Sequence, residues 1–85
     1  MLKYTITISK TAQKQLNDIP ESVAEILIAA MQGLAYNPRP SGYKKLKGRN
    51  GYRIRKGNYR ILYEIFDSFL IIDVIAIGHR KNIYK

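Results

Sequence analysis

Three consecutive segments with the pattern of strands, in the C-terminal part of the chain, constrain its fold most strongly. They span residues 52–56, 59–66 and 69–77, and only the pairs Gly57–Asn58 and Asp67–Ser68 separate them. Short segments rich in β-branched and aromatic residues and joined by two-residue turn signals are typical of antiparallel strands in hairpins. The last segment is almost continuously apolar, which predicts a central strand covered on at least one face.

The first part of the chain predicts one strand followed by two helices. Apolar and polar residues alternate over residues 2–8, as in a half-buried strand. Ser9 is suited to cap a helix whose apolar residues recur up to Ile19, and Pro20 is suited to the first turn of a second helix over residues 20–34. The sequence therefore predicts one α+β domain over residues 1–85. Its order is β-α-α-β-β-β, with a small, mainly antiparallel sheet packed on a helical hairpin.

Two-residue turns would fix which side chains share a face of the sheet. Arg55 would then lie opposite Arg60, with Arg53 as a diagonal neighbour, and Phe66 would lie opposite Phe69. The face predicted to contact the helices collects Tyr52, Ile54, Ile61, Tyr63, Ile65, Leu70, Ile72 and Val74. The opposite face combines the arginines with the apolar residues Leu62, Phe66, Phe69, Ile71 and Ile75. Such an apolar surface predicts that a partner or the C-terminal segment covers it.

The chain is strongly basic, with 15 Lys and Arg against six Asp and Glu and a formal charge of +9. No acidic residue lies between Glu25 and Glu64. The same interval holds Arg39, Lys44, Lys45, Lys47, Arg49, Arg53, Arg55, Lys56 and Arg60. A localised positive charge predicts an anionic partner such as nucleic acid, an acidic protein or an anionic membrane. A face charged only for solubility is the alternative.

The predicted pair of Arg55 and Arg60 points to a functional site. Like charges opposite each other destabilise a sheet, and the planar guanidinium group matches phosphate oxygens. A phosphate bound among the arginines would remove the repulsion. The alternative is a structural role, in which Glu64 and Asp73 on the same face neutralise them.

The composition limits the chemistry that the chain can perform. It has no cysteine and a single histidine, His79, which argues against a metal site, so no cofactor is expected. No segment approaches the ~20 apolar residues that span a bilayer, and no signal peptide is evident, so we expect a cytoplasmic protein without a membrane role. RNA carries its own nucleophile, the 2′-hydroxyl, so a metal-independent reaction on RNA stays possible. Arginines would stabilise the phosphate, and His79 is the residue suited to proton transfer near neutral pH.

Several motifs together resemble the RelE branch of the RelE/ParE toxin superfamily. They are the segments at 52–55 (YRIR), 58–65 (NYRILYEI) and 78–84 (GHRKNIY), together with the run KKLKG at 44–48. Their order and spacing match over essentially the whole chain. The resemblance implies the toxin of a toxin–antitoxin pair that cleaves mRNA in the ribosomal A site and leaves a 2′,3′-cyclic phosphate. A RelB-like antitoxin would wrap and block it.

The resemblance also implies roles for individual residues. Arg60 would stabilise the scissile phosphate, Arg80 would contact it or assist the leaving group, and Tyr84 would stack on an mRNA base. Arg53 and Arg55 stand where some relatives have lysines proposed for acid–base work. Because arginine is a poor general base, these two would only stabilise charge or His79 would transfer the proton. The remaining basic residues expected to bind RNA are Lys44, Lys45, Lys47, Arg49 and Lys56.

Two other functions fit the charge. One is a ParE-like inhibitor of DNA gyrase without nuclease activity, and the other is a non-catalytic RNA-binding module. A gyrase inhibitor has little need of the combination of Arg60, His79, Arg80 and Tyr84. A non-catalytic RNA-binding module explains the charge but not the like-charged pair beside a histidine. A membrane-surface role is less well supported, because the basic residues fall on strands and a loop instead of one amphipathic helix.

Overall fold

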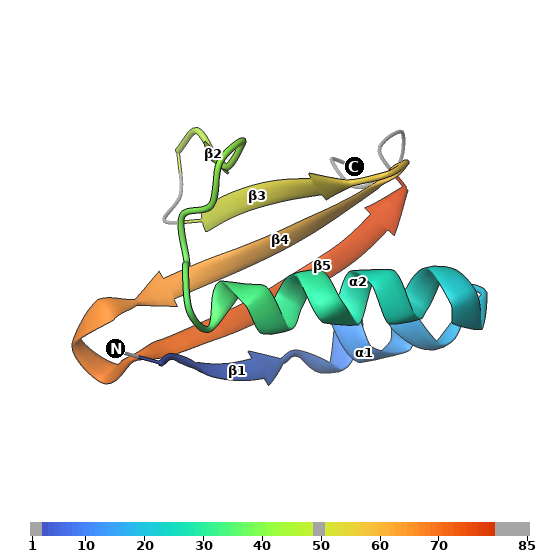
Figure 1. Cartoon of the computed structure of the whole chain (residues 1–85), viewed down its shortest axis with the longest axis horizontal. Helices are drawn as coiled ribbons and strands as arrows, with labels where there is room; N and C mark the ends of the chain where they lie inside the picture. The colour runs from blue at the N-terminus through green and yellow to red at the C-terminus, as the bar shows by residue number, and fades with distance from the viewer. Residues whose placement is uncertain (1–2, 49–50, 80–85) are drawn as a thin grey trace.

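The computed structural model describes residues 3–48 and 51–79 and has the predicted α+β architecture. The elements follow in the order β1 (Thr5–Ile8), α1 (Lys10–Asn17), α2 (Glu21–Leu34), β2 (Lys44–Lys45), β3 (Gly51–Lys56), β4 (Tyr59–Phe66), a 3-10 turn (Asp67–Phe69) and β5 (Ile71–His79). The strands form one sheet in the order β1-β5-β4-β3-β2 (Figure 1). Only β1 and β5 pair in parallel, so the sheet is mainly antiparallel, as predicted.

Both helices pack on the same face of the sheet, which we call the helix-side face. Residues of α1 and α2 share one buried cluster with the sheet. The cluster consists of Ala12, Leu16, Leu27, Met31, Leu34, Ile54, Ile61, Tyr63, Ile72, Val74 and Ile77. Ser9 caps α1 as predicted, because its hydroxyl accepts a hydrogen bond from the amide of Ala12 at 3.0 Å. No helix within the described ranges 3–48 and 51–79 is long and apolar enough to cross a membrane.

The register predicted for the first hairpin is confirmed. Lys56 pairs with Tyr59, Arg55 with Arg60 and Ile54 with Ile61, around a turn in which Gly57 has a φ of +61°. Glycine adopts this left-handed conformation without the penalty that a Cβ atom imposes. The local turn signal was therefore sufficient to place the side chains of β3 and β4.

The register predicted for the second hairpin is wrong. The connection is a four-residue loop, in which the 3-10 turn is followed by Leu70 with a φ of +54°. Phe66 consequently pairs with Ile71 instead of Phe69. Leu70, which we expected on the helix-side face, lies in the loop and is not part of the buried cluster.

A β-bulge in β5 changes the face on which the end of this strand presents its side chains. Tyr63 pairs with Val74, but Leu62 pairs with Ala76, so Ile75 is the extra residue. One extra residue reverses the alternation beyond it. Ile77 therefore joins the core at 1% exposure, and His79 follows it to the helix-side face.

Side chains of the first helical segment stabilise the bulged backbone. The strand β1 ends at Ile8, so β5 has no β1 partner beyond Val74. The Ser9 hydroxyl donates to the carbonyl of Ile75 at 2.7 Å, and the amide of Ile77 donates to Gln15 Oε1 at 2.7 Å. These bonds provide hydrogen-bond partners for the Ile75 carbonyl and the Ile77 amide, which would otherwise have no partner inside the protein.

Candidate nucleic-acid interface

Four basic residues gather at one end of the sheet face that points away from the helices. In the β3–β4 pairing, Arg55 lies opposite Arg60 and Arg53 lies opposite Leu62. The short strand β2 places Lys44 opposite Arg53. Directly opposed residues share a face, so Arg53, Arg55, Arg60 and Lys44 lie together; we call them the arginine site. The strand β2 was not predicted, because two lysines carry no strand pattern.

The arginine site combines exposed and half-buried cations. Lys44 and Arg55 are exposed, whereas Arg53 and Arg60 are half-buried and their Nε atoms are buried. A guanidinium group whose stem is held by its surroundings keeps a defined geometry, which suits recognition of a phosphate. On the β5 side, Arg60 lies opposite Gly78, which adds no side chain beside it.

The acidic residues of the same face lie further along the strands. Glu64 is opposite Asp73, and the Leu62–Ala76 pair separates this acidic row from the row of Arg60. Asp73 accepts a hydrogen bond from the Thr7 hydroxyl at 3.0 Å. The outer face is thus divided into a basic end, an acidic middle and an apolar end at Phe66 and Ile71.

His79 does not share a face with the arginines. It lies opposite Tyr59 on the helix-side face, and the two rings meet edge-on with centroids 5.8 Å apart. Lys56 pairs with Tyr59 from the other side, so Lys56, Tyr59 and His79 form one row across the end of the sheet. The bulge at Ile75 causes this placement, because unbroken alternation would have put His79 beside the arginines.

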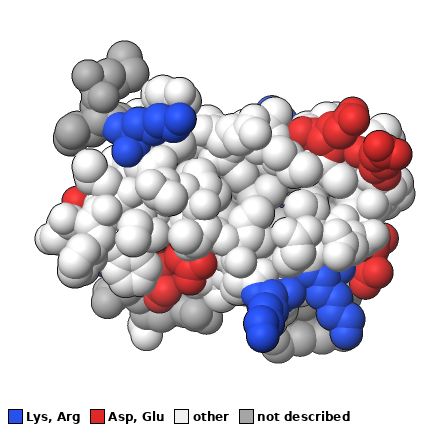
Figure 2. Space-filling view, turned by 90° about the horizontal axis from the view of Figure 1, so that it is seen from below, with Lys and Arg blue, Asp and Glu red and all other residues white. Residues whose placement is uncertain are grey.

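The other described residues predicted to bind RNA lie near both ends of β3, with Lys45 and Lys47 near its start and Lys56 at its last position. Lys45 lies opposite Tyr52 and, like Lys47 and Lys56, is exposed. Arg49, Arg80 and Tyr84 lie outside the described residues. Seen from the side of β1 and α1, the surface is mostly uncharged and carries groups of both signs (Figure 2). In contrast, all four residues of the arginine site are basic.

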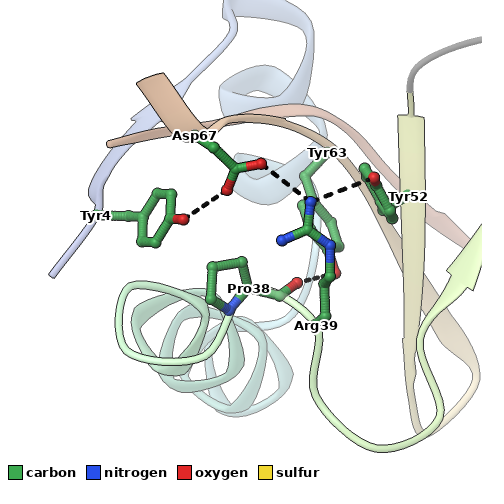
Figure 3. Close-up of polar contacts among 6 residues, drawn as sticks. All are labelled: Tyr4, Pro38, Arg39, Tyr52, Tyr63 and Asp67. Carbon is green, nitrogen blue, oxygen red and sulfur yellow. Dashed lines mark hydrogen bonds and ion pairs between the residues drawn. The ribbon is translucent and has the colours of Figure 1, made fainter. Parts of the chain in front are cut away.

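Arg39 and Asp67 fasten the connection between α2 and β2 to the sheet (Figure 3). The Arg39 guanidinium donates to Asp67 at 3.2 Å and to the Tyr52 hydroxyl at 3.4 Å, and lies over the Tyr52 ring at 5.3 Å. The Tyr4 hydroxyl donates to the other Asp67 oxygen at 2.6 Å. The Tyr63 hydroxyl donates to the Pro38 carbonyl at 2.7 Å.

The pKa values of this cluster follow from its contacts. The hydrogen bond from Tyr4, followed by that from Arg39, lowers the pKa of Asp67, and the bond to Asp67 raises the pKa of Arg39. Burial raises the pKa of Tyr63 to about 12. The carboxylate form of Asp67 therefore persists at neutral pH, and the ion pair is lost only as the pH falls through this lowered pKa. Sequence reasoning missed the cluster, because Arg39 and Asp67 are 28 residues apart.

We expect Asp67→Asn to loosen the segment 37–48, which carries Lys44. The substitution removes the ion pair with Arg39 and weakens the Tyr4 contact, while the fold keeps its core. Hydrogen exchange measured by mass spectrometry should show faster exchange in peptides covering 37–48. Asp18→Asn removes the same charge from an exposed position in the helical region and is the control. Equal rates of hydrogen exchange in peptides 37–48 of the two variants would contradict the role of Asp67 in holding this segment against the sheet.

Comparison with known proteins identifies the family to which this chain belongs. The family described as ParE toxin of type II toxin–antitoxin system, parDE, matches residues 6–84. Toxin RelE3 of Methanocaldococcus jannaschii is 33% identical, with 93% of each chain covered. Toxin RelE of Mycobacterium tuberculosis is 30% identical, covering 96% of this chain and 87% of the relative.

Solved structures agree with the sequence relatives. The toxin–antitoxin complex RelBE2 of Mycobacterium tuberculosis contains a chain with a TM-score of 0.85 and 26% identity, covering 96% of this chain and 97% of that one. The archaeal RelE–RelB complex of Pyrococcus horikoshii gives a TM-score of 0.83 at 25% identity, covering 95% and 99%. The chain therefore belongs to the RelE/ParE family of toxins of type II toxin–antitoxin systems.

Proposed function

We propose that this protein is a ribosome-dependent endoribonuclease that acts in the cytoplasm and cleaves mRNA in the ribosomal A site. The observation that carries the proposal is the gathering of Arg53, Arg55 and Arg60 on one face of the sheet. Several relatives are named RelE toxins, which supports the nuclease branch of the family. Ribosomes and mRNA are the proposed partners in the reaction.

The proposed reaction needs no metal ion, because the substrate supplies the nucleophile. The 2′-oxygen attacks the adjacent phosphorus, the bond from phosphorus to the 5′-oxygen breaks, and a 2′,3′-cyclic phosphate remains. One proton leaves the 2′-hydroxyl and one is delivered to the 5′-oxygen. Arg53, Arg55 and Arg60 stabilise the charge that develops on the phosphate oxygens.

The roles of the remaining predicted residues are part of the proposal. Arg80 contacts the phosphate or assists the leaving group, and Tyr84 stacks on a base. The exposed residues Lys44, Lys45, Lys47, Arg49 and Lys56 bind the RNA backbone, mainly through charge. Proton transfer by His79 stays a prediction, because its ring lies on the face opposite the arginine site.

An antitoxin is the proposed protein partner. The structures similar to this chain include complexes of RelE toxins with RelB antitoxins. A toxin carrying a charge of +9 suits an acidic antitoxin, since complementary charge speeds association and favours the correct partner.

The test compares cleavage of one mRNA free in solution and on programmed ribosomes. The proposal predicts cuts in the A-site codon only when ribosomes are present, and their suppression by the antitoxin. Cleavage of free mRNA at the same rate would contradict ribosome dependence.

Inhibition of DNA gyrase is the second candidate, and the matching family description, which names ParE, favours it. A supercoiling assay with purified gyrase distinguishes the two. Inhibition of supercoiling together with intact mRNA on ribosomes would establish the ParE-type activity in place of the nuclease.

A further inference from the structure

The short strand β2 lies at the edge of the sheet and presents a lysine on each of its two faces (Figure 1). Lys44 lies opposite Arg53 on the outer face, where both belong to the arginine site. Lys45 lies opposite Tyr52, whose ring stacks on the core residue Tyr63 with centroids 5.9 Å apart. Because directly opposed residues share a face, Lys45 is on the helix-side face. The positive charge of the arginine site therefore continues around this edge of the sheet.

Tyr43, just before β2, adds an exposed aromatic ring on the same side as Lys45. It is 40% exposed, and its ring contacts the ring of Tyr52, with centroids 6.0 Å apart. A turn positions its backbone, because the Tyr43 amide donates to the Pro40 carbonyl at 3.0 Å and Gly42 has a φ of +89°. Tyr43 is thus held by the turn and by Tyr52, while part of its surface stays open to solvent.

Tyr52, which supports the Tyr43 ring, is itself held in place. The Arg39 guanidinium lies over the Tyr52 ring at 5.3 Å and donates to the Tyr52 hydroxyl at 3.4 Å (Figure 3). The same guanidinium pairs with Asp67 at 3.2 Å, which offsets its positive charge. We therefore assign the binding of a phosphate on this side of the sheet to the exposed Lys45.

An exposed aromatic ring beside an exposed lysine matches the two parts of a nucleotide. A base stacks on the ring whatever its identity, since every base has a π-face, and the ammonium group pairs with a phosphate. The position of this pair selects the RNA of the arginine site as the ligand. Lys44 and Lys45 are consecutive residues on opposite faces, so a strand that leaves the arginine site across β2 reaches Lys45 and Tyr43 next.

We propose that Tyr43 and Lys45 form a second subsite for the mRNA bound at the arginine site, which we call the edge subsite. One unpaired base outside the scissile position stacks on the Tyr43 ring, and a phosphate beside that base pairs with Lys45. The identity of the RNA rests on the proposed function, whereas the nucleotide chemistry follows from the two side chains. The edge subsite contributes to binding and takes no part in the chemical step.

The experiment measures the affinity of the full chain for a short single-stranded RNA by fluorescence anisotropy. The 2′-hydroxyls of this RNA are methylated, so it binds without being cleaved. The proposal predicts that Tyr43→Leu raises the Kd roughly 5–150-fold, which corresponds to the loss of one base stacked on an aromatic ring. Lys45→Gln should reduce the slope of log Kd against log salt concentration by about 0.7, the contribution of one phosphate contact in a single strand, and Tyr43→Leu should leave this slope unchanged.

Tyr36→Leu is the matched control. Tyr36 is 57% exposed and also lies beside a lysine, because Lys3 Nζ is 5.7 Å from the centroid of its ring. Lys3 precedes β1, which is at the edge of the sheet opposite to β2, so this tyrosine is remote from the arginine site. Tyr36→Leu should bind the RNA as the wild type does.

Two further measurements separate stacking from an effect on folding. Tyr43→Phe keeps the ring and should retain most of the affinity, and circular dichroism checks that each variant is folded. An RNA that lacks one base should bind the wild type more weakly when the missing base is the stacked one. The same RNA should bind Tyr43→Leu no more weakly than the complete RNA does.

The outcomes are distinguishable from those for the nuclease. Equal Kd values for Tyr43→Leu and Tyr36→Leu overturn the edge subsite, even if the wild type cleaves mRNA on ribosomes. If the wild type cuts no mRNA but Tyr43→Leu loses affinity for RNA, the edge subsite stands and the nuclease proposal falls. Weaker binding of the antitoxin with unchanged affinity for RNA overturns the proposal and assigns this surface to a protein.

The source of the RNA is tested on programmed ribosomes. A photoreactive amino acid in place of Tyr43 should crosslink to the mRNA. Crosslinks to ribosomal RNA alone would overturn the assignment of the edge subsite to the mRNA.

Discussion

Arg60→Ala is expected to lower the rate of mRNA cleavage on programmed ribosomes by roughly 10²–10³-fold, the loss typical of removing one preorganised donor to a developing anion. Arg60 is half-buried with its Nε atom buried, so its guanidinium has a defined position opposite Arg55. Single-turnover kinetics at saturating toxin would measure the chemical step separately from binding.

Two control variants test whether the loss of cleavage is specific to the Arg60 guanidinium. Arg60→Lys keeps the charge but loses the planar fork of donors, so we expect only partial recovery of the rate. Lys10→Ala removes the same charge from the exposed first turn of α1 and should leave cleavage within a few-fold of the wild type. Equal losses for Arg60→Ala and Lys10→Ala would show that net charge matters and that Arg60 has no special position.

Leu27→Ala is expected to destabilise the protein by ~2–5 kcal/mol, because it leaves a cavity under α2. Leu27 is fully buried at 0% exposure and belongs to the single core cluster of the described chain. A small domain has only about 5–15 kcal/mol of stability in total, so Tm should fall by roughly 10–40 °C.

The neighbouring residue gives a matched control for this prediction. Ile26 is in the same helix but is 52% exposed, and Ile26→Ala should change the stability by less than ~0.5 kcal/mol. Thermal and urea denaturation followed by circular dichroism would measure both variants. Equal destabilisation would show that α2 does not pack on the sheet through Leu27.

The sequence predicts the arginine site because the signal for it is local. The turn at Gly57–Asn58 sets the pairing of β3 with β4, so the opposition of Arg55 and Arg60 follows from counting residues. Burial of Ile54, Ile61 and Tyr63 was predicted in the same way and is confirmed. Ile72 and Val74 are also buried as predicted, because the register of the second hairpin was wrong by two residues and a shift of two leaves each side chain on the same face. Lys44 was predicted to bind RNA, but its position opposite Arg53 was not predicted, because pairing of β2 depends on a loop without a regular pattern.

The parts that sequence reasoning missed depend on contacts between distant segments. The bulge at Ile75 is stabilised by Ser9, which lies 66 residues earlier, and by the Gln15 side chain bound to Ile77. No local pattern in β5 reports these bonds, so the face of His79 could not be derived. The left-handed backbone conformation of Leu70 could not be predicted either, since this conformation is unusual for a residue other than glycine.

The most direct test of the proposed nuclease is the chemistry of the 3′ ends of mRNA fragments produced on programmed ribosomes. Ligation that requires prior removal of a 2′,3′-cyclic phosphate, followed by sequencing, gives the position and the type of each end. The account predicts cyclic-phosphate ends within the A-site codon for the native protein and their disappearance in Arg60→Ala. Intact mRNA, or fragments ending in a free 3′-hydroxyl, would contradict it.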